Sequence, residues 1–462
     1  MNYNDVIKQI EYVLKFKTET SRIETKSAKD GFPKKCYDTI SAFANKSGGI
    51  IIFGIDEEND FSLNDVYDIN DLQKQITSLC SDAFVPIIRP EFLSVEYKNK
   101  KLLVVQINEI AQNKKPCFYK PKGLNKGSYT RVGDRDDVMT DYEIYALQSY
   151  NDRVFEDSRP IRNAELSDLN KEKLEEYIEK IKKNKPNFAK NDFNKCLKLC
   201  HIIDNNEDKI FPTLAGMLLF GEYPQLFYPQ IFVACTNIPG LQMGDTNSLG
   251  ERFIDNKRVE GTIEEMLLGT MNFLERNMKS SVVINDKGIR IDRAEYPLKA
   301  LREAVVNALV HRDYSAQKET VYIAVNMYKD RIEIISPGAL FGSNKLEKLG
   351  TSDVMETRNP TIVKILEENS SILENRHSGI ETMRREMMAY GLPEPEFYNE
   401  RDSFKVIFRK EKIEEYEKNK NGLLKNVKSY LNMFFKHSFD KKESIVKEKE
   451  TLYGKKEKKW NI

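Results

Sequence analysis

Glu303 and Asn307 stand four residues apart in the apolar stretch LREAVVNALVHRDYS, a spacing that places both side chains on one face of a helix. An Asn carbonyl oxygen suits Mg²⁺, which prefers oxygen ligands and is commonly shared with phosphates. A Glu one turn earlier can orient or deprotonate a water that attacks a γ-phosphate. The stretch is therefore either a core helix that carries two polar side chains or a helix that also binds a nucleotide, with Asn307 as metal ligand and Glu303 as catalytic base.

Three short motifs follow this helix, and each of them is weak alone. Gly338 lies in the turn ISPGAL, and Arg358 and Asn359 lie in TRNP. Ser378 and Gly379 open an expected helix in RHSGIETM, where backbone N–H groups can bind an anion such as phosphate. In this order the motifs support one another, and the resemblance described next implies a pocket for ATP and Mg²⁺ with the following contacts: Asn307, Gly338, Arg358, Asn359, Ser378 and Gly379.

This ordered set resembles the GHKL ATP-binding fold shared by gyrase, histidine kinases and mismatch-repair ATPases. More closely, AVVNALVHRDYS resembles the variant of that fold that follows AlbA-type domains in many bacterial proteins. The resemblance implies a two-layer α/β sandwich over 291–410. Two departures bear on activity. The adenine-binding Asp of the general fold has no counterpart in ISPGAL, and the usual Gly-Thr-Gly phosphate loop reads His377-Ser378-Gly379, which leaves ATP hydrolysis open.

A second set of residues that could do chemistry lies near the N-terminus. Glu19 and Glu24 belong to ETSRIETKSA, close to Lys26, and Asp56 and Glu57 follow the apolar run GGIIIFGI. Carboxylates at strand ends can hold Mg²⁺ or Mn²⁺, which polarises a phosphate and activates water. Glu19, Glu24 and Asp56 are therefore candidate catalytic residues of a phosphodiesterase, with Glu24 and Asp56 as metal ligands. The alternative is that they are ordinary surface acids.

Residues 111–135 carry seven basic side chains and a single acid, with Phe118, Tyr119 and Tyr129 interleaved. Lys and Arg neutralise phosphates, and aromatic faces stack unpaired bases. The alternative is a solvated hairpin whose aromatic rings pack inward. The composition favours a surface for DNA or RNA with the following expected contacts: Lys26, Lys114, Lys115, Lys120, Lys122, Lys126 and Arg131.

The segments ETSRIETK, SAFANKSGGIIIFGID and KPCFYKPKGLNKGSYTRVG resemble the AlbA-type domain of the Schlafen family, over about residues 15–145. In eukaryotic Schlafens this domain is linked to RNA, including cleavage of transfer RNA by three carboxylates. Glu19 and Glu24 match the first two carboxylates, and Asp56 or Glu57 falls at the third. Bacterial relatives are usually described as DNA-binding proteins, so the resemblance implies a nucleic-acid ligand more firmly than it implies cleavage.

Strand-like apolar runs alternate with helical patterns along the chain, which predicts an α/β (α+β) multidomain protein. We expect an AlbA-type domain with a mixed sheet, followed by the GHKL-like sandwich. The expected segments are 1–150 for the nucleic-acid-binding domain, 151–210 for a helical linker, 211–290 for a connecting α/β region, 291–410 for the ATP-binding domain and 411–462 for a Lys-rich extension.

The net charge points to no particular partner, because 73 basic residues balance 72 acidic ones. Six scattered cysteines are typical of reduced thiols in a cytosol rather than of a disulfide framework. The first residues lack the pattern of a signal peptide, and no apolar run approaches the ~18 residues of a membrane span. We therefore expect a cytoplasmic protein without a membrane partner, and homo-oligomerisation is left open.

Together, these patterns predict a regulatory or defence protein that binds nucleic acid and carries an ATP module. One alternative is a metal-dependent RNase of Schlafen type that uses Glu19, Glu24 and Asp56. Another is a non-enzymatic interaction protein whose nucleotide pocket is degenerate at His377. ATPase and endoribonuclease activities are both left open, whereas the lack of G-x-x-x-x-G-K-[ST] argues against a P-loop helicase.

Overall fold

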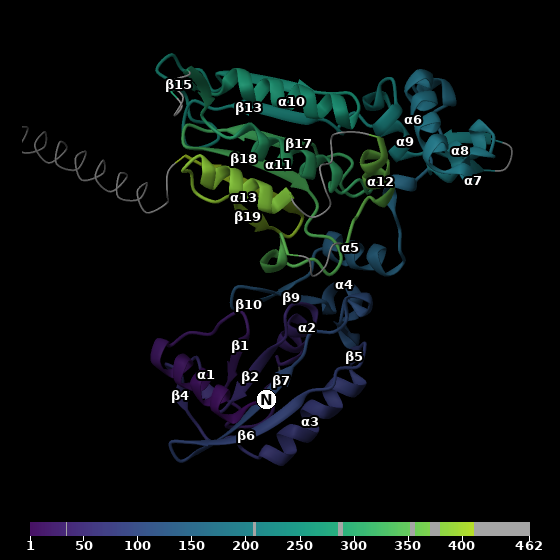
Figure 1. Ribbon diagram of the computed structural model, residues 1–462. Coiled ribbons are helices and arrows are strands. Elements are labelled where there is room, and N and C mark those ends of the chain that lie inside the picture. The colour runs from purple at the N-terminus through teal and green to yellow at the C-terminus, as the bar shows by residue number, and fades with distance from the viewer. Residues whose placement is uncertain (34, 207–208, 285–289, 352–355, 370–378, 411–462) are drawn as a thin grey trace, which may run out of the picture.

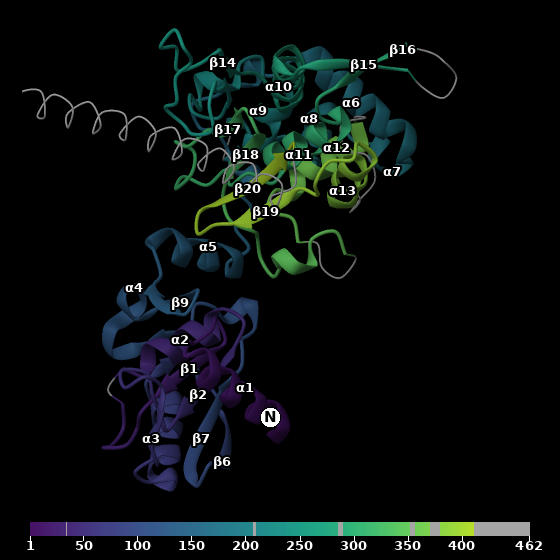
Figure 2. The same ribbon diagram turned by 90° about the vertical axis from the view of Figure 1, so that its left-hand side faces the viewer.

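The chain forms two bodies that meet along one boundary, where the helix α5 (Asp141–Asn151) lies (Figures 1 and 2). The Lys-rich extension predicted for 411–462 lies outside the described residues. No helix in the described part of the chain has the length and apolarity needed to cross a membrane. The computed structural model describes residues 1–33, 35–206, 209–284, 290–351, 356–369 and 379–410.

The main elements of the N-terminal body are α1 (Tyr3–Phe16), β1 (Ile23–Lys26), α2 (Tyr37–Asn45), β2 (Gly49–Phe53), α3 (Ile69–Asp82), β6 (Glu91–Tyr97) and β7 (Lys100–Ile107). Their strands form a mixed sheet in the order β1-β2-β7-β6, in which only β1 and β2 run parallel. Alternate residues of β2 face opposite sides. Ile51 and Phe53 pack with α2 and α3, whereas Ile50 and Ile52 pack with α1. Burial on both faces explains the unbroken apolar run of this strand.

Short elements complete this body: β3 (Ile55–Asp56), β4 (Ser62–Leu63), β5 (Phe84–Val85), η1 (Gln112–Lys114), β8 (Phe118–Tyr119), η2 (Lys120–Lys122), α4 (Gly123–Gly127), β9 (Tyr129–Val132) and β10 (Arg135–Val138). β9 and β10 form an antiparallel hairpin that packs against α2. The hairpin register sets Arg131 directly opposite Asp136. A cation and a carboxylate are therefore neighbours across this ladder.

The C-terminal body is built from β13 (Val233–Asn237), β14 (Asp255–Val259), α10 (Ile263–Asn277), α11 (Leu298–Val310), β17 (Ile323–Met327), β18 (Arg331–Pro337), α13 (Gly379–Ala389), β19 (Glu396–Asn399) and β20 (Ser403–Arg409). Six strands form one sheet in the order β14-β13-β17-β18-β20-β19, and only β13 and β17 run parallel. α10, α11 and α13 lie on one face of this sheet (Figures 1 and 2). This arrangement confirms the predicted α/β sandwich.

The predicted boundaries at 210 and 290 do not separate folding units. β13, β14 and α10 come from the segment 211–290, yet they share the sheet and core of 291–410. The segment 151–210 joins the same core through α6 (Lys171–Asn184), so it is not a linker. α6 is rich in Lys and Glu, but its apolar residues recur at helical spacing and form a stripe along one face. The stripe consists of Leu174, Tyr177, Ile178 and Ile181.

The remaining elements pack around this core or extend from it. They are η3 (Glu156–Ser158), η4 (Leu166–Asp168), α7 (Pro186–Ala189), α8 (Phe193–Leu199), β11 (Ile203–Asn206), β12 (Lys209–Pro212), α9 (Leu214–Phe220), η5 (Pro224–Leu226), β15 (Ser280–Ile284), β16 (Arg290–Ala294), η6 (Leu346–Lys348) and α12 (Pro360–Asn369).

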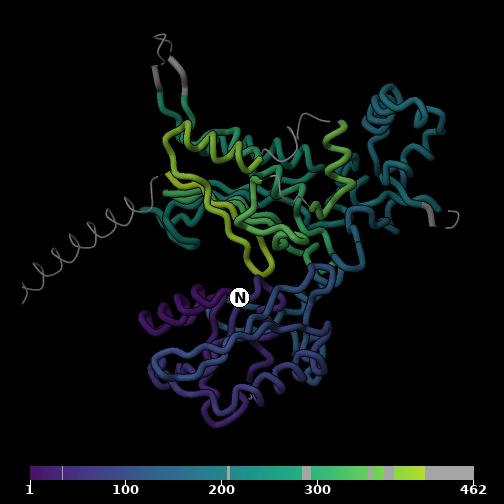
Figure 3. The backbone as a smooth tube through the Cα atoms, turned by 60° about the horizontal axis from the view of Figure 1, so that its bottom comes forward, coloured from purple at the N-terminus to yellow at the C-terminus, as the bar shows by residue number. Residues whose placement is uncertain are grey.

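α5 joins the two bodies with hydrogen bonds from both of its ends. The Tyr142 hydroxyl donates to Asp313 Oδ2 at 2.6 Å, and the Tyr150 hydroxyl donates to Glu356 Oε1 at 3.0 Å. Figure 3 shows the chain passing from the N-terminal body through this region to the C-terminal one. The N-terminal domain therefore contacts segments that also form the candidate site.

Candidate functional site

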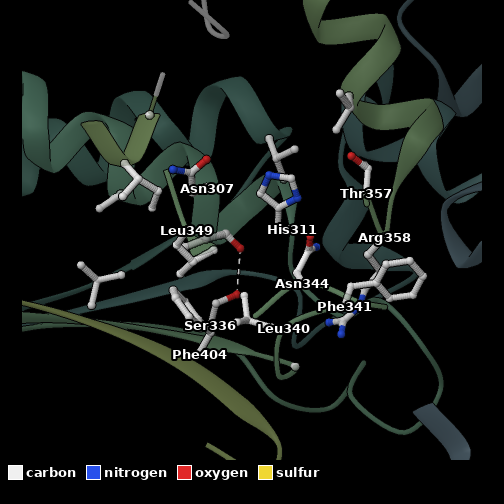
Figure 4. Close-up of a pocket in the computed structure, with 18 of the residues that line it drawn as sticks. Asn307, His311, Ser336, Leu340, Phe341, Asn344, Leu349, Thr357, Arg358 and Phe404 are labelled. Atoms are coloured by element: carbon white, nitrogen blue, oxygen red, sulfur yellow. Dashed lines mark hydrogen bonds between the residues drawn. The ribbon is translucent and has the colours of Figure 1, made fainter. Parts of the chain in front are cut away.

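A cavity of about 760 Å³ lies between α11, the sheet, the segment that follows β18 and the start of α13. Its size is typical of pockets for small ligands. Residues that are distant in the sequence converge on it, and Figure 4 shows Asn307 on α11, His311 directly after this helix, and Asn344 beneath His311. The predicted nucleotide residues among its lining are Glu303, Asn307, Gly338, Arg358 and Gly379.

Glu303, Asn307 and Gly379 form the end of the pocket where α13 begins. Asn307 Nδ2 donates to Glu303 Oε1 at 3.2 Å, as expected for side chains one helical turn apart. A Cβ atom built on Gly379 would lie only 2.0 Å from Glu303 Oε1 and 3.2 Å from Asn307 Nδ2. The α13 backbone therefore approaches these two side chains closely, and a larger residue here would push the Glu303 carboxylate aside. A phosphate bound at this helix start would have to displace the Glu303 carboxylate.

Arg358 supplies a positive charge at the wall of the pocket. Its side chain is 10% exposed, Nη2 donates to the Ala339 carbonyl at 2.8 Å, and Nη1 lies 3.6 Å from Asp313 Oδ2. Nη1 has no hydrogen-bond partner in the described part of the chain. Burial raises the pKa of Asp313, but the charge of Arg358 and the hydrogen bond from Tyr142 outweigh it, so the pKa lies below its ordinary value. Asp313 is therefore an ionised partner for Arg358.

Gly338 is required beside Arg358 for two reasons. Its φ of +102° lies in the region that favours glycine, and a Cβ atom there would lie 2.0 Å from Arg358 Nη1. Ser336, two residues earlier, uses its hydroxyl to donate to the Ala308 carbonyl at 2.8 Å. The ISPGAL turn thus lets the guanidinium approach the backbone and ties β18 to α11.

Two further predicted contacts are not placed in the pocket. Asn359 is fully buried, and its Nδ2 donates to the carbonyls of Val310 and Arg312 at 2.8 Å each. These bonds satisfy carbonyl groups at the end of α11, which gives Asn359 a structural role. Ser378 and His377 lie outside the described residues.

His311 lines the pocket directly after α11, and sequence reasoning did not select it as a ligand contact. The His311 side chain is exposed at the mouth of the cavity, but desolvation by the many surrounding residues and then the charge of Arg358 lower its pKa, so the imidazole is neutral near pH 7. A neutral imidazole can donate one hydrogen bond and accept another. The signal was its spacing, because His311 follows Asn307 by four residues and so continues the same helical face.

Arg131 lies at the centre of a buried acidic cluster in the N-terminal domain, rather than on a surface for nucleic acid. Its side chain is 1% exposed, and Nη1 lies 2.8 Å from Glu24 Oε2 and 2.9 Å from Asp136 Oδ1. Nη2 lies 3.9 Å from Glu19 Oε2 and donates to the Thr20 carbonyl at 3.1 Å. The prediction that Arg131 contacts nucleic acid is therefore wrong in this conformation, because its charge is used inside the domain.

The three predicted carboxylates are not assembled into a metal site. Glu24 is paired with Lys26 and Arg131, and Asp56 lies at the end of β3. Among the described residues, no group of three or more His, Cys, Asp or Glu side chains could hold a metal ion. The acid that joins Glu24 is Asp136, which sequence reasoning missed. The hairpin register of β9 and β10 was the signal that could have identified it.

Glu19 is buried in this cluster, where its Oε1 accepts hydrogen bonds from the Thr25 backbone N–H at 2.6 Å and from Thr25 Oγ1 at 2.9 Å. Burial, and then the charge of Glu24, raise the pKa of Glu19 from 4.5 to about 7. A carboxyl with a raised pKa stabilises the fold fully below 4.5, and this contribution is lost as the pH rises through about 7.

We therefore expect Glu19→Gln to stabilise the protein above pH 7 but not at pH 5. The expected gain is about 1–3 kcal/mol, because Gln keeps an acceptor for Thr25 without a buried charge. Thermal melts of both proteins between pH 5 and pH 8 measure it, with the exposed Glu58→Gln as control. Melting curves that stay parallel across this range would contradict the assignment.

The predicted lysines divide into two groups. Lys26 pairs with Glu24, and Lys115 is buried with its Nζ 2.8 Å from Glu109 Oε1. Neither is available to a phosphate without losing its partner. The exposed group consists of Lys114, Lys120, Lys122 and Lys126.

The aromatic residues of this region pack among themselves rather than outward. The rings of Tyr37 and Tyr119 stack with centroids 4.5 Å apart, and Tyr129 is buried beside them. Lys122 Nζ lies 4.6 Å from the centre of the Tyr37 ring and donates to the Tyr129 hydroxyl at 2.9 Å. These rings therefore pack inward, as expected for a solvated hairpin, and the lysines form the exposed surface above them.

Comparison with known proteins gives three matching family models. Residues 19–140 match the family described as "Schlafen, AlbA_2". Residues 146–234 match a domain of unknown function, DUF8451. Residues 321–408 match the family described as "Putative ATP-dependent DNA helicase recG C-terminal". A search of curated proteins finds no match.

Two solved structures are also similar to parts of this chain. The DIP2311 protein from Corynebacterium diphtheriae is 18% identical with a TM-score of 0.41, and the match covers 87% of this chain and 80% of that one. The N-terminal domain of a protein titled "Putative ATP-dependent DNA Helicase RecG-related Protein" from Nitrosomonas europaea is 28% identical with a TM-score of 0.24. That match covers 31% of this chain and 97% of the other. The chain thus carries an N-terminal segment that matches the Schlafen AlbA_2 family and a C-terminal segment that matches the recG C-terminal family.

Proposed function

We propose that this protein binds ATP with Mg²⁺ in the pocket beside α11 and binds nucleic acid through its N-terminal domain, as a regulatory or defence factor. The observation that carries the ATP proposal is the convergence of Glu303, Asn307 and Gly379. Core packing alone does not require a carboxylate and an amide against a glycine at a helix start. The match of 321–408 to a family described as an ATP-dependent helicase C-terminal region supports the same proposal.

Each of these residues has a distinct task in the proposed pocket. Asn307 turns its Nδ2 toward Glu303, which leaves its amide oxygen for Mg²⁺. Mg²⁺, when bound, would neutralise charge on the phosphates. The backbone N–H groups at the start of α13 bind phosphate oxygens once the Glu303 carboxylate has moved aside. In its new position, Glu303 accepts a proton from the attacking water.

Arg358 contributes a further contact that the resemblance alone does not predict in detail. Its Nη1 atom needs an acceptor, and a ligand in the adjoining cavity can provide one. A buried donor without a partner costs free energy, so a ligand oxygen or ring nitrogen at this place is favoured. We therefore assign Arg358 to nucleotide binding together with the neutral imidazole of His311.

The direct test of the ATP proposal is a thermal melt of the whole chain with and without Mg-ATP. A ligand that binds only the folded state stabilises it by about 2.7 kcal/mol at a concentration of 100 Kd, so the melting temperature should rise. ATP in EDTA is the control, because it lacks the metal that Asn307 is proposed to bind. An unchanged melting temperature at millimolar Mg-ATP would mean that the pocket does not bind ATP.

The nucleic-acid proposal depends on the exposed lysines of η1, η2 and α4 and on the match to the Schlafen AlbA_2 family. Replacing Lys120, Lys122 and Lys126 together with Gln should weaken binding and flatten its salt dependence. The slope of log affinity against log salt should fall by about 2–3, because roughly 0.7–0.9 counterions are released per phosphate contact.

The matched control for this variant changes three lysines at the opposite end of the same domain, Lys98, Lys100 and Lys101, at the turn between β6 and β7. Fluorescence anisotropy with a labelled oligonucleotide at several salt concentrations measures both slopes. If the two triple variants have equal slopes, η2 and α4 do not form the contact surface.

A further inference from the structure

A second cavity, of about 690 Å³, lies at the boundary between the two bodies. Its walls come from η1, from α5 and the residues after it, and from the loop that follows β18. Phe341, Glu356 and Thr357 line both this cavity and the nucleotide pocket. The two cavities therefore share a wall, although they open between different elements.

Aromatic rings dominate one side of this second cavity. Tyr150 and Phe341 meet edge to face, with ring centroids 5.5 Å apart and an interplanar angle of 72°. Phe155 also lines the cavity and is 42% exposed. An exposed phenylalanine beside two further rings offers a face on which a flat ligand can stack.

Carboxamide groups supply the polar part of the lining. Asn151 Nδ2 donates to the Lys115 carbonyl at 2.6 Å, whereas its Oδ1 has no hydrogen-bond partner in the described part of the chain. Gln112 and Asn113 add two further amides. Amides both donate and accept, which matches the mixed pattern on the edge of a nucleobase.

The small number of charged residues in the cavity lining indicates which flat ligands it can bind. Among the described lining residues, Arg153 is the single basic side chain, and Glu356, which accepts a hydrogen bond from Tyr150, is the single acidic one. A triphosphate would need more positive charge than this, but a base carried by a strand would not. Gln112 and Asn113 belong to η1, which continues into Lys114, so the basic surface leads to the cavity.

We propose that this interdomain cavity binds an unpaired nucleobase, stacked on Phe155 and the Tyr150–Phe341 pair. The source favoured by the charge is a single strand held by the exposed lysines, so this inference depends on the proposed nucleic-acid binding. Because Phe341, Glu356 and Thr357 line both cavities, any effect of the base on the affinity for ATP has to be matched by an equal effect of ATP on the affinity for the base.

The test uses the whole chain and a single-stranded oligonucleotide with one 2-aminopurine, a fluorescent base. Phe155→Ala is expected to lower the affinity for this strand about tenfold and to abolish the fluorescence change, as one lost stacking contact predicts. The salt slope should stay unchanged, because the lysines are intact. Tyr398→Ala is the control, since Tyr398 is similarly exposed, at 41%, but lies on β19.

A second arm separates this inference from the proposed function. 2-Aminopurine nucleoside monophosphate is titrated without Mg²⁺ and without ATP, so that the proposed metal-dependent pocket does not compete for the probe. If the wild type binds no strand but binds the monophosphate, and Phe155→Ala loses this signal, the cavity holds a free nucleotide base and only the strand proposal fails. If Phe155→Ala matches the wild type with both probes, or if the wild type binds neither, the cavity is not a base site.

Discussion

Asn307→Ala is expected to lose the Mg²⁺-dependent part of ATP binding while the protein stays folded. The side chain is half-buried and donates a hydrogen bond to Glu303, which is itself only half-buried, so removal of the amide leaves no fully buried partner in the core. Loss of outer groups around a metal commonly costs 10- to 100-fold in affinity, and loss of a direct ligand should cost at least as much. Calorimetric titration of the wild type and the variant with Mg-ATP measures this change.

Titration with ATP in EDTA identifies the cause of the loss. Both proteins should bind metal-free ATP with the same affinity, because only the metal contact differs between them. If Asn307→Ala weakens ATP binding equally with and without Mg²⁺, Asn307 contacts the nucleotide itself or only shapes the pocket. If the variant binds Mg-ATP as the wild type does, the residue has no role in the site.

Glu303→Gln should separate ATP binding from ATP hydrolysis. Gln cannot accept a proton from water, so any hydrolysis should fall by about 10²- to 10⁴-fold. Affinity for Mg-ATP should stay the same or increase, because a carboxylate that lies against the start of α13 opposes the entry of phosphate. A phosphate-release assay and the titration described for Asn307 give the two quantities independently.

The control for this variant is Glu367→Gln, which changes another carboxylate in the pocket lining that lies on α12. It should leave the rate of hydrolysis unchanged. If Glu303→Gln lowers affinity and rate together, the residue holds the nucleotide and is not a base. If the wild type binds Mg-ATP without hydrolysing it, the pocket has a binding function, and the increased affinity of Glu303→Gln is then the decisive measurement.

The sequence predicts the pocket best where its residues depend on local geometry. Glu303 and Asn307 share a helical face because of their spacing, and the structure brings Gly379 to them from 72 residues away. The pair Arg358 and Asn359 shows the limit of such reasoning. The Arg358 side chain lies in the pocket wall, whereas the Asn359 side chain caps α11. No local sequence pattern predicts which of two adjacent polar side chains faces the pocket.

The N-terminal domain shows a different limit, because composition does not report burial. Arg131 belongs to a basic stretch, and only the pairing of β9 with β10 shows that it neutralises Asp136 and Glu24 inside the fold. In the same way, the composition of α6 predicts a linker, although four apolar residues hold the helix in the core. Both errors arise because the composition of a segment averages over residues that face the core and residues that face solvent.

The hydrogen bond from Tyr142 to Asp313 also constrains how such a protein can evolve. Asp313 orients Arg358, so a side chain encoded in the N-terminal half helps to build the pocket of the C-terminal half. A gene fusion that exchanged the first domain would have to preserve a donor at this place. The two halves are therefore expected to be inherited as one unit, and a substitution at either end of this bond should be followed by a compensating change at the other.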